Sequence, residues 1–464
     1  MQEHLQEERR ETPVIGEYDV VVVGGGPAGL MAAAAAAREG RSTVLVERYG
    51  FLGGAGTMGG LSTFCGLHAR VRGEHRRVVR GYTDELLDRL ERMDGLSAPH
   101  LSVQDRIQAQ AFDISAYKVA ADEFLAGSGA DLLFHATAVG AVRDAEDRIE
   151  AVLVESKSGR AALRGRVFID GSGDADLVRW AGAPVERSAE LLYPSLMFRI
   201  NGVDPEAAGE AWRTVARLMD EAEESGRRTF PRKKPIVRPQ RNPLEWRANL
   251  TQLSNPDGSA VDGTDVWQLS HGELQGRRQV WDVFGFIRDS TPGFEDAYVV
   301  DIAPQIGIRE TYRSVGAYQL SERDILDCVD FEDTVGVQGW PVEAHVEGTV
   351  EFRFPPAGLD SRGFNQLPYR MLVPQGVRNL LTVGRSASMT QWGQSSARVT
   401  GPCFVMGQAA GVAAHLSLAA GVGVADVHVP DLQHRLEETG AYLGTDLPPD
   451  PLPGRPAGPS TGGR

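Results

Sequence analysis

Cysteine is scarce in this chain of 464 residues, and the three cysteines present are widely separated. Cys65, Cys328 and Cys403 form no C-x-x-C pair. This spacing argues against an iron–sulfur cluster and against a structural zinc site, so we expect no metal. So few thiols also fit a reducing cytoplasm.

Basic residues are fewer than acidic residues in the sequence. The chain has 48 Lys and Arg residues against 63 Asp and Glu residues, which gives a net charge of −15. That balance argues against nucleic acid and anionic membrane surfaces as partners. We expect a small-molecule substrate instead. The sequence leaves open whether the protein forms a homo-oligomer.

Long apolar runs are also missing. No segment is expected to reach the length of a membrane span, and residues 1–13, MQEHLQEERRETP, lack the apolar centre of a secretory signal. Both observations predict a cytoplasmic protein.

Residues 18–48 predict a strand, a glycine-rich turn, a helix and a second strand. Residues 19–23 are a β-branched run typical of a buried parallel strand. Residues 30–38 are mostly alanine and fit a narrow helix lying on a sheet. Residues 42–46 form the second strand, so the stretch predicts a βαβ unit.

The turn of this unit carries a nucleotide-binding pattern. Gly24, Gly26 and Gly29 stand in G-x-G-x-x-G spacing, which allows a tight turn, close approach of a pyrophosphate, and close helix–sheet packing. Glu47 ends the second strand, where a carboxylate accepts hydrogen bonds from a ribose. The pattern predicts an adenine dinucleotide but does not by itself separate NAD from FAD.

The rest of the chain predicts two domains, because 464 residues are too many for one core. Residues 138–143, 148–155 and 161–166 have the pattern of a β-meander that leads to a separate parallel strand at 167–169. The basic stretch 227–241, RRTFPRKKPIVRPQR, is expected to be a solvated surface loop.

Helices are expected at several further places. They are residues 81–93, 115–126, 205–225, 271–289 and 400–418. Residues 271–289 are expected to bury Leu274 and Trp281, and Thr400 is the expected N-cap of the last helix, with Pro402 in its first turn.

Several separated motifs resemble the bacterial FAD-dependent oxidoreductase family, within the glutathione-reductase-like (two-dinucleotide-binding-fold) flavoprotein superfamily. They are VVVGGGPAGL with the following ER, GFLGGAGTMGG, VFIDGSGDADL, IGIRETYRSVGAYQLSERD, LPYRMLVPQGVRNLLTVGRS and RVTGPCFVMGQAAGVAA. The resemblance covers most of residues 18–420. It implies fold and FAD as cofactor, but not the substrate.

The resemblance implies an α/β fold with two parts. Residues 15–190 and 362–445 form a discontinuous Rossmann-like FAD-binding domain, in which a parallel sheet carries a three-stranded β-meander. Residues 191–361 form a mixed α+β substrate domain. Residues 1–14 are a disordered lead-in and residues 446–464 a disordered tail.

The resemblance and the chemistry of FAD together assign a set of cofactor-binding residues. The turn at residues 53–57 passes close to the flavin, the helix beginning near Thr400 supplies a positive field, and Arg385 reaches the pyrophosphate or the flavin. The adenine takes backbone hydrogen bonds near Val139. The set is Gly24, Gly26, Pro27, Ala28, Gly29, Glu47, Arg48, Gly53, Gly54, Thr57, Val139, Gly171, Gly173, Asp174, Gly384, Arg385, Arg398 and Gly401.

Five residues are candidates for catalysis. His345 is a general base that removes a proton as hydride leaves for flavin N5. Arg309 and Arg313 would share a face if helical, and either clamp a substrate carboxylate or join a structural network with Glu310, Glu322 and Asp324; the structural network is favoured. The last two are Cys65 and His68, in FCGLH, which could lie over the flavin, with His68 as a covalent link and Cys65 as a buried small side chain.

Three functions are compatible with these motifs. The leading one is an FAD-dependent dehydrogenase or oxidase that removes two electrons from a small organic substrate and is reoxidised by O₂ or another acceptor. A flavin monooxygenase using O₂ and NAD(P)H is the first alternative. A flavin-binding electron-transfer subunit is the second, although the chain has no cysteine cluster for another redox centre.

Overall fold

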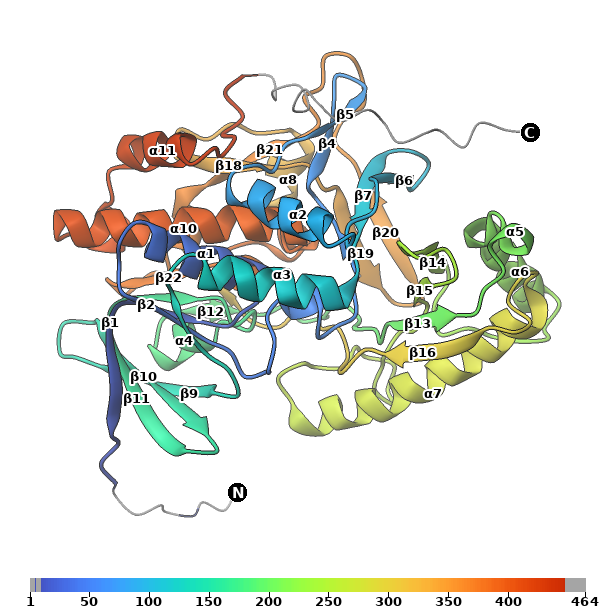
Figure 1. Cartoon of the computed structure of the whole chain (residues 1–464), viewed down its shortest axis with the longest axis horizontal. Helices are drawn as coiled ribbons and strands as arrows, with labels where there is room; N and C mark the ends of the chain where they lie inside the picture. The colour runs from blue at the N-terminus through green and yellow to red at the C-terminus, as the bar shows by residue number, and fades with distance from the viewer. Residues whose placement is uncertain (1–4, 6–9, 447–464) are drawn as a thin grey trace.

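The computed structural model describes residue 5 and residues 10–446 (Figure 1). The predicted disorder of residues 1–4, 6–9 and 447–464 lies outside the described residues. The first strand begins at Val14, inside the range expected for the lead-in.

A seven-stranded sheet organises the first half of the fold. Its strands lie in the order β8-β2-β1-β11-β10-β9, and β22 pairs with β11. They are β1 (Val14–Val23), β2 (Thr43–Val46), β8 (Asp131–Leu133), β9 (Thr137–Arg143), β10 (Ile149–Ser156), β11 (Gly159–Asp170) and β22 (Leu380–Thr382). The sheet is parallel from β8 to β11 and β22, and antiparallel from β11 to β9.

The predicted meander is present, but its third strand was wrongly divided. Residues 161–166 and 167–169 belong to one strand, β11, of 12 residues. Its first part pairs with β10, as Leu163 does with Val152, and its last part pairs with β22, as Phe168 does with Leu380. One long strand therefore joins the meander to the parallel sheet.

Both faces of β1 are buried, as its β-branched run predicts. Val20 and Val22 belong to the core that contains helix α1 (Pro27–Arg38), and Val21 and Val23 belong to the core that contains helix α4 (Asp176–Trp180). The glycine turn is thereby fixed at the carboxyl end of a strand held from both sides.

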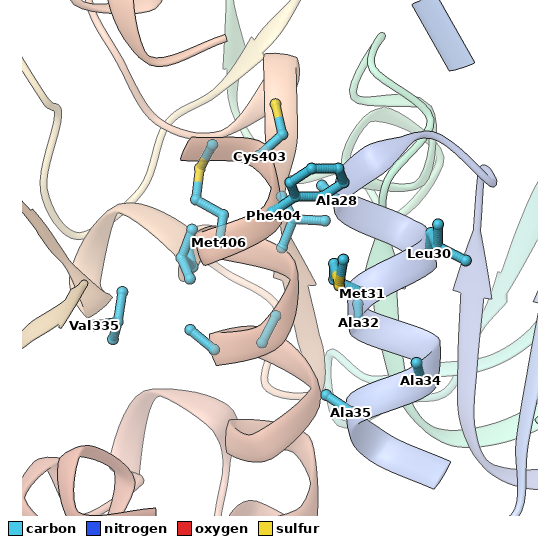
Figure 2. Close-up of a cluster of buried hydrophobic side chains, with 14 of the residues drawn as sticks. Ala28, Leu30, Met31, Ala32, Ala34, Ala35, Val335, Cys403, Phe404 and Met406 are labelled. Carbon is cyan, nitrogen blue, oxygen red and sulfur yellow. The ribbon is translucent and has the colours of Figure 1, made fainter. Parts of the chain in front are cut away.

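Helix α10 (Thr400–Ala420) lies along α1, although the two are almost 400 residues apart (Figures 1 and 2). Small residues allow the approach: Cβ atoms at Gly407 and Gly411 would collide with the backbone of α1. The N-cap is Val399 rather than Thr400, and no side chain caps the helix. Pro402 stands third in the helix, two positions beyond the first position, which suits proline best.

The length and composition of α10 would suffice for a membrane span, contrary to the expectation from the sequence. The 18-residue window has a mean hydropathy of 1.4, but 67% of it is buried inside the protein. The apolar surface of α10 thus packs against α1 and the neighbouring core.

Further helices and short strands complete the part of the fold that contains the seven-stranded sheet, which we call the first core. The helices are α2 (Tyr82–Arg92), α3 (Ile114–Ala126), α8 (Glu322–Leu326), α9 (Gln391–Ala397) and α11 (Val429–Glu438). The short strands form four groups: β3 (Thr63–Phe64), β7 (Ile107–Ala111) and β6 (His100–Ser102); β4 (His68–Val71) and β5 (Glu74–Arg77); β18 (Thr334–Gln338) and β21 (Asn365–Pro368); β12 (Val185–Glu186) and β17 (Arg313–Ser314).

A second core lies beside the first, at the right of Figure 1, within residues 196–306. Its antiparallel sheet has the order β14-β15-β13-β16. The strands are β14 (Ile236–Pro239), β15 (Trp246–Asn249), β13 (Phe198–Asn201) and β16 (Tyr298–Ile302), and the helices are α5 (Pro205–Ala208), α6 (Ala211–Glu224) and α7 (Val266–Ser290). The exact domain boundaries stay a prediction.

Two expectations about this second core were wrong. The helix predicted over residues 205–225 is divided into α5 and α6, because Gly209 stands between them with φ of +45°. On α7, Leu274 and Trp281 are 55% and 64% exposed rather than buried. The core side of α7 consists instead of residues such as Val280, Val283 and Ile287.

Candidate functional site

A cavity of about 320 Å³ opens between the two cores. It is lined by the glycine turn after β1, the short turn at Gly54–Gly56 and the beginning of α10. From the other side it is lined by β14, β15 and the hairpin of β19 (Val342–Val346) with β20 (Thr349–Arg353). Segments far apart in sequence therefore form one site.

The glycine turn has the geometry that a pyrophosphate requires. Gly24 has φ of +95°, a conformation that favours glycine. A Cβ at Gly29 would collide with the Gly24 carbonyl, so the third glycine lets α1 pack on the strand. At Gly26 a Cβ would meet only Gly54 Cα, at 4.0 Å, so this backbone faces free space in the cavity.

Glu47 lies at the end of β2 and lines the same cavity. Its carboxylate accepts the backbone N–H of Gly25 at 2.7 Å and that of Tyr49 at 2.9 Å. Burial raises the pKa of Glu47, and these hydrogen bonds oppose the rise. At the other end, Val399 and Thr400 bring the N-terminus of α10 to the cavity. The residues present therefore fit FAD, with an acid for the ribose, a glycine turn for the pyrophosphate and a helix dipole for the flavin.

Most of the residues predicted to bind the cofactor line the cavity. They are Gly24, Gly26, Pro27, Ala28, Glu47, Arg48, Gly54, Gly171, Gly173, Gly384, Arg385 and Arg398. The others, Gly29, Gly53, Thr57, Val139, Asp174 and Gly401, lie behind this lining.

Four of these six residues support the lining from behind. Thr57 donates its hydroxyl to the Leu52 carbonyl at 2.7 Å, and Asp174 accepts from Arg385 at 2.6 Å. Gly29 and Gly401 are sites where a Cβ would strike neighbouring backbone. Near the predicted adenine position, Thr137 and Ala138 line the cavity rather than Val139.

Arg385 differs from the prediction in its hydrogen bonds. It lines the cavity, but Nε donates to the Gly173 carbonyl at 2.7 Å, Nη1 to the Ile308 carbonyl and Nη2 to Asp174. Its charge is thus balanced by the protein.

His345 and Glu343 form a buried pair on β19, and both line the cavity. Glu343 lies 3.2 Å from His345 Nε2 and accepts the Trp340 indole N–H at 2.8 Å. Burial opposes ionisation of Glu343, but hydrogen bonds from His345 and Trp340 and the charge of Arg398 lower its pKa to about 2. Burial and the nearby Arg309 lower the pKa of His345 well below its ordinary value. A neutral imidazole facing an ionised carboxylate carries its proton on Nε2, which leaves the Nδ1 lone pair free to accept a proton.

The two arginines of the RETYR motif have different surroundings. Residues 309–313 are not helical, so the shared face that a helix would give is absent. Arg309 lines the cavity and donates to the Tyr193 carbonyl and to Ser195 Oγ, both at 2.7 Å.

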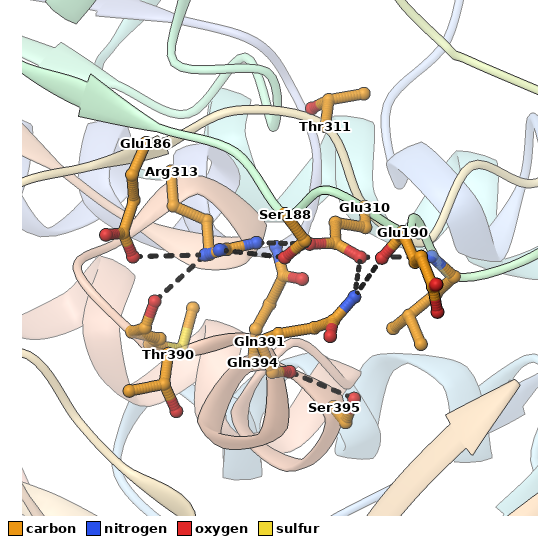
Figure 3. A network of polar contacts seen from close by, with 12 residues as sticks. Glu186, Ser188, Glu190, Glu310, Thr311, Arg313, Thr390, Gln391, Gln394 and Ser395 are labelled. Carbon is orange, nitrogen blue, oxygen red and sulfur yellow. Dashed lines mark hydrogen bonds and ion pairs between the residues drawn. The ribbon is translucent and has the colours of Figure 1, made fainter. Parts of the chain in front are cut away.

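Arg313 belongs to a network away from the cavity lining, shown in Figure 3. It contacts Glu310 and Ser188, and it lies 3.6 Å from Glu186. Of the predicted acidic partners only Glu310 pairs with it. Glu322 instead pairs with Arg353, and Asp324 caps α8.

Cys65 and His68 are separated by the fold. Cys65 lines the cavity, where burial raises the pKa of its thiol to about 12, so it remains a protonated, weakly reactive thiol. His68 lies on β4 outside the cavity lining and pairs across the hairpin with Arg77. Its position does not favour a covalent link to a flavin in the cavity.

His68 predicts a loss of stability in mild acid. Burial, with a smaller effect from Arg77, lowers the pKa of His68 to about 4 from an ordinary 6.5. Between these two pH values the unfolded chain binds a proton at His68 that the folded chain does not bind. The contribution of neutral His68 to stability is therefore complete above pH 6.5 and is lost as pH falls toward 4. We expect the slope from this residue to approach about 1.4 kcal/mol per pH unit between pH 6 and pH 5, measured by urea unfolding. His68→Gln should reduce the slope by that amount, whereas His434→Gln, at an exposed position on α11, should leave it unchanged.

The site also contains arginines that sequence reasoning missed. The basic stretch 227–241 was expected to be solvated, but Arg232 is only 1% exposed and Arg238 lines the cavity. Arg247 on β15 lines the cavity as well. The sequence did contain a signal for this burial. Phe230, Ile236 and Val237 interrupt the run of charged residues, and Phe230 and Val237 belong to the second core.

No group of three or more His, Cys, Asp or Glu side chains that could hold a metal occurs among residues 10–446.

Comparison with known proteins gives one extended match. The family model described as FAD dependent oxidoreductase matches residues 19–436. No curated protein sequence matches the chain.

Three solved structures illustrate what this chain is similar to. A geranylgeranyl bacteriochlorophyll reductase-like protein from Thermoplasma acidophilum is 13% identical, with a TM-score of 0.48, and the match covers 91% of this chain and 83% of that one. CabE, an aromatic hydroxylase from angucycline biosynthesis, is 15% identical, with a TM-score of 0.44 and coverage of 92% and 68%. The flavin-dependent brominase Bmp2 is 13% identical, with a TM-score of 0.44 and coverage of 91% and 83%.

The family match includes lining residues on both sides of the cavity, from the first strand to the last helix. The chain belongs to the FAD dependent oxidoreductase family, and it is an enzyme whose cofactor is FAD.

Proposed function

We propose that this protein is a dehydrogenase or oxidase that removes two electrons from a small organic substrate bound between the flavin and the β19–β20 hairpin. The pair of His345 and Glu343 at the cavity carries this proposal. FAD, when bound, supplies the hydride acceptor at N5.

In this proposal His345 accepts the second hydrogen of the substrate as a proton. The neutral imidazole is the basic form, and its Nδ1 has no hydrogen-bond partner among the described residues. Glu343 fixes the tautomer through Nε2 and stabilises the imidazolium that forms. The substrate thus loses a hydride and a proton, which balances a two-electron oxidation.

The beginning of α10 would complete the site by its charge. A helix N-terminus favours negative charge by up to about 2 kcal/mol when partly buried, and negative charge develops on the flavin as it is reduced. Val399 and Thr400 at this end both line the cavity, which supports placing the flavin there.

The cofactor position can be tested at Gly26, and we expect Gly26→Val to lose flavin without unfolding. Gly26 has φ of −68° and ψ of 179°, which valine adopts without strain, and a Cβ meets no protein atom closer than 4.0 Å. The added methyl groups would occupy space where the pyrophosphate approaches the backbone, so affinity for FAD should fall at least tenfold. Flavin absorbance after reconstitution measures binding, and the melting temperature of the apoprotein controls for folding. Undiminished flavin binding in a folded variant would contradict the proposed position.

The reaction class is tested by anaerobic reduction. The FAD-loaded protein is mixed with panels of alcohols, amines, hydroxy acids and amino acids, and we expect one class to bleach the oxidised flavin band without NAD(P)H. A different result would favour a flavin monooxygenase: rapid bleaching by NAD(P)H alone, with oxygen consumption that depends on an organic substrate. Reduction by neither, but by a partner protein, would favour an electron-transfer subunit.

The finer assignments belong to this proposal as well. They are a substrate domain at residues 191–361, a place in the glutathione-reductase-like superfamily, and a cytoplasmic location. The three free cysteines support the last of these.

A further inference from the structure

Five arginines gather at the substrate end of the cavity. Arg238, Arg247, Arg309 and Arg398 line it, and Arg232 lies directly behind, where its Nη1 donates to the lining residue Asn249 at 2.7 Å. They come from five places in the chain: the segment before β14, strand β14, strand β15, the segment after β16, and the end of α9. The fold thus concentrates positive charge in a protein whose net charge is −15.

These guanidinium groups lack acidic partners. Among the residues that the structure describes, none of the five has a carboxylate oxygen within 4 Å. Nitrogen atoms on three of them are buried without any hydrogen-bond partner: Nε and Nη2 of Arg232, Nε of Arg247 and Nε of Arg398. At this end of the cavity Glu343 is the one lining carboxylate in the described chain, and His345 and Trp340 already use it.

The arginines also repel one another. Burial lowers the pKa of Arg232 to about 10, and Arg247 adds to the effect. Burial lowers the pKa of Arg309 well below its ordinary value, with further contributions from Arg398 and Arg232. Each group still carries its charge near neutral pH, because guanidinium is deprotonated only far above it. Buried charges without partners are costly to the fold, so such a cluster points to a ligand that neutralises it.

The cofactor does not provide that neutralisation. The pyrophosphate of FAD belongs at the glycine turn, where Arg48 lines the cavity. Arg385 lies beside the cluster, since it donates to the carbonyl of Ile308, but its charge is already balanced by Asp174. Glu343 acts electrostatically on Arg232, Arg247, Arg309 and Arg398, and Arg238 lies near Arg247.

We propose that the substrate is a small organic acid with at least two anionic groups, held by Arg247 and Arg238 on one side and by Arg309 and Arg398 on the other. Guanidinium forks bind carboxylates and phosphates with paired hydrogen bonds, so either a dicarboxylate or a phosphorylated acid satisfies them. This inference rests on the proposed function, since it names the substrate class of the same site. The bond to be oxidised lies between the anionic groups, next to His345.

The test uses the oxidised FAD-loaded protein and measures ligand binding by the change in the flavin spectrum, with no turnover. The probes are succinate and 3-phosphoglycerate, which each have two anionic groups and are called the dianions below, butyrate as a monoanion and succinamide as a neutral analogue. We expect one dianion to bind at least tenfold more tightly than butyrate, and succinamide not to bind. Whether succinate or 3-phosphoglycerate binds identifies the second anionic group as a carboxylate or a phosphate.

Two variants connect binding to the arginines. Arg247→Gln should weaken dianion binding at least tenfold, whereas Arg217→Gln removes the same charge from exposed helix α6 and should leave it unchanged. Without ligand, Arg247→Gln should melt no lower than the unaltered protein, because it relieves repulsion; a purely structural arginine would give a lower melting temperature and unchanged binding. If Arg247→Gln does not fold, the same measurements are made on Arg238→Gln, because Arg238 is less buried than Arg247.

The inference is overturned if neither dianion binds at millimolar concentration, or if succinamide and butyrate bind as tightly as the dianions. Such a failure is distinct from failure of the proposed function. Anaerobic flavin reduction by an uncharged substrate would preserve the oxidase or dehydrogenase proposal and exclude the anionic one.

Discussion

Replacing Gly411 by leucine is expected to lower the free energy of unfolding by about 3 kcal/mol or more. A Cβ at this position would lie 2.5 Å from the Ala35 Cβ and closer still to the Ala32 carbonyl oxygen. These atoms belong to α1, which is held on the sheet by β1 and β2, so the backbone has little room to move. Figure 2 shows how closely the two helices approach. Urea unfolding followed by circular dichroism measures the loss.

The matched control is Gly285→Ala, in the middle of helix α7. A Cβ there meets no atom within 4 Å, so the change should stabilise the protein by up to about 1 kcal/mol through helix propensity. Because α1 begins at the glycine turn, Gly411→Leu should also weaken FAD binding. A variant with unchanged stability would show that α10 moves freely against α1.

Replacing His345 by glutamine is expected to lower kcat by a factor of about 10² to 10⁴, the usual contribution of a general base. Glutamine keeps a donor toward Glu343 but has no nitrogen lone pair that can take a proton. The flavin content, and the affinity of the oxidised protein for its ligand, should remain near those of the unaltered protein. The measurement is single-turnover flavin reduction with the substrate class found in the anaerobic panel.

His434→Gln on the exposed face of α11 is the control, because it removes a histidine far from the cavity lining. A second readout is the pH dependence of flavin reduction. The residual rate of His345→Gln should rise with pH as hydroxide replaces the missing base. Turnover by the variant equal to that of the unaltered protein would remove His345 from the mechanism.

The positions of the glycine turn and Glu47 were predictable because their signals are local. Gly24, Gly26 and Glu47 lie within one βαβ unit, where turn geometry and strand length set their positions relative to one another. The structure places all three at the cavity, with β1 buried on both faces as its valines predict.

The arginines around His345 were less predictable because these residues meet only through tertiary packing. A charged stretch is usually solvated, so Arg232 and Arg238 were assigned to the surface. Strands β14 and β15 draw them inward against the hairpin that carries His345. Periodicity on α7 likewise favoured burying Leu274 and Trp281, but the four-stranded sheet packs on a different side of that helix.

The sequence by itself predicted an adenine dinucleotide and the βαβ unit that would hold its adenosine and pyrophosphate, and the family resemblance narrowed the cofactor to FAD. Spacing along one strand, one turn and one helix suffices for the βαβ unit, since each step has a fixed length. Only the tertiary structure decided that Arg309 faces the cavity while Arg313 does not, and that four arginines line the same cavity as Glu343, with Arg232 behind them. Their common position depends on how two sheets and a hairpin pack, and no local spacing encodes that distance.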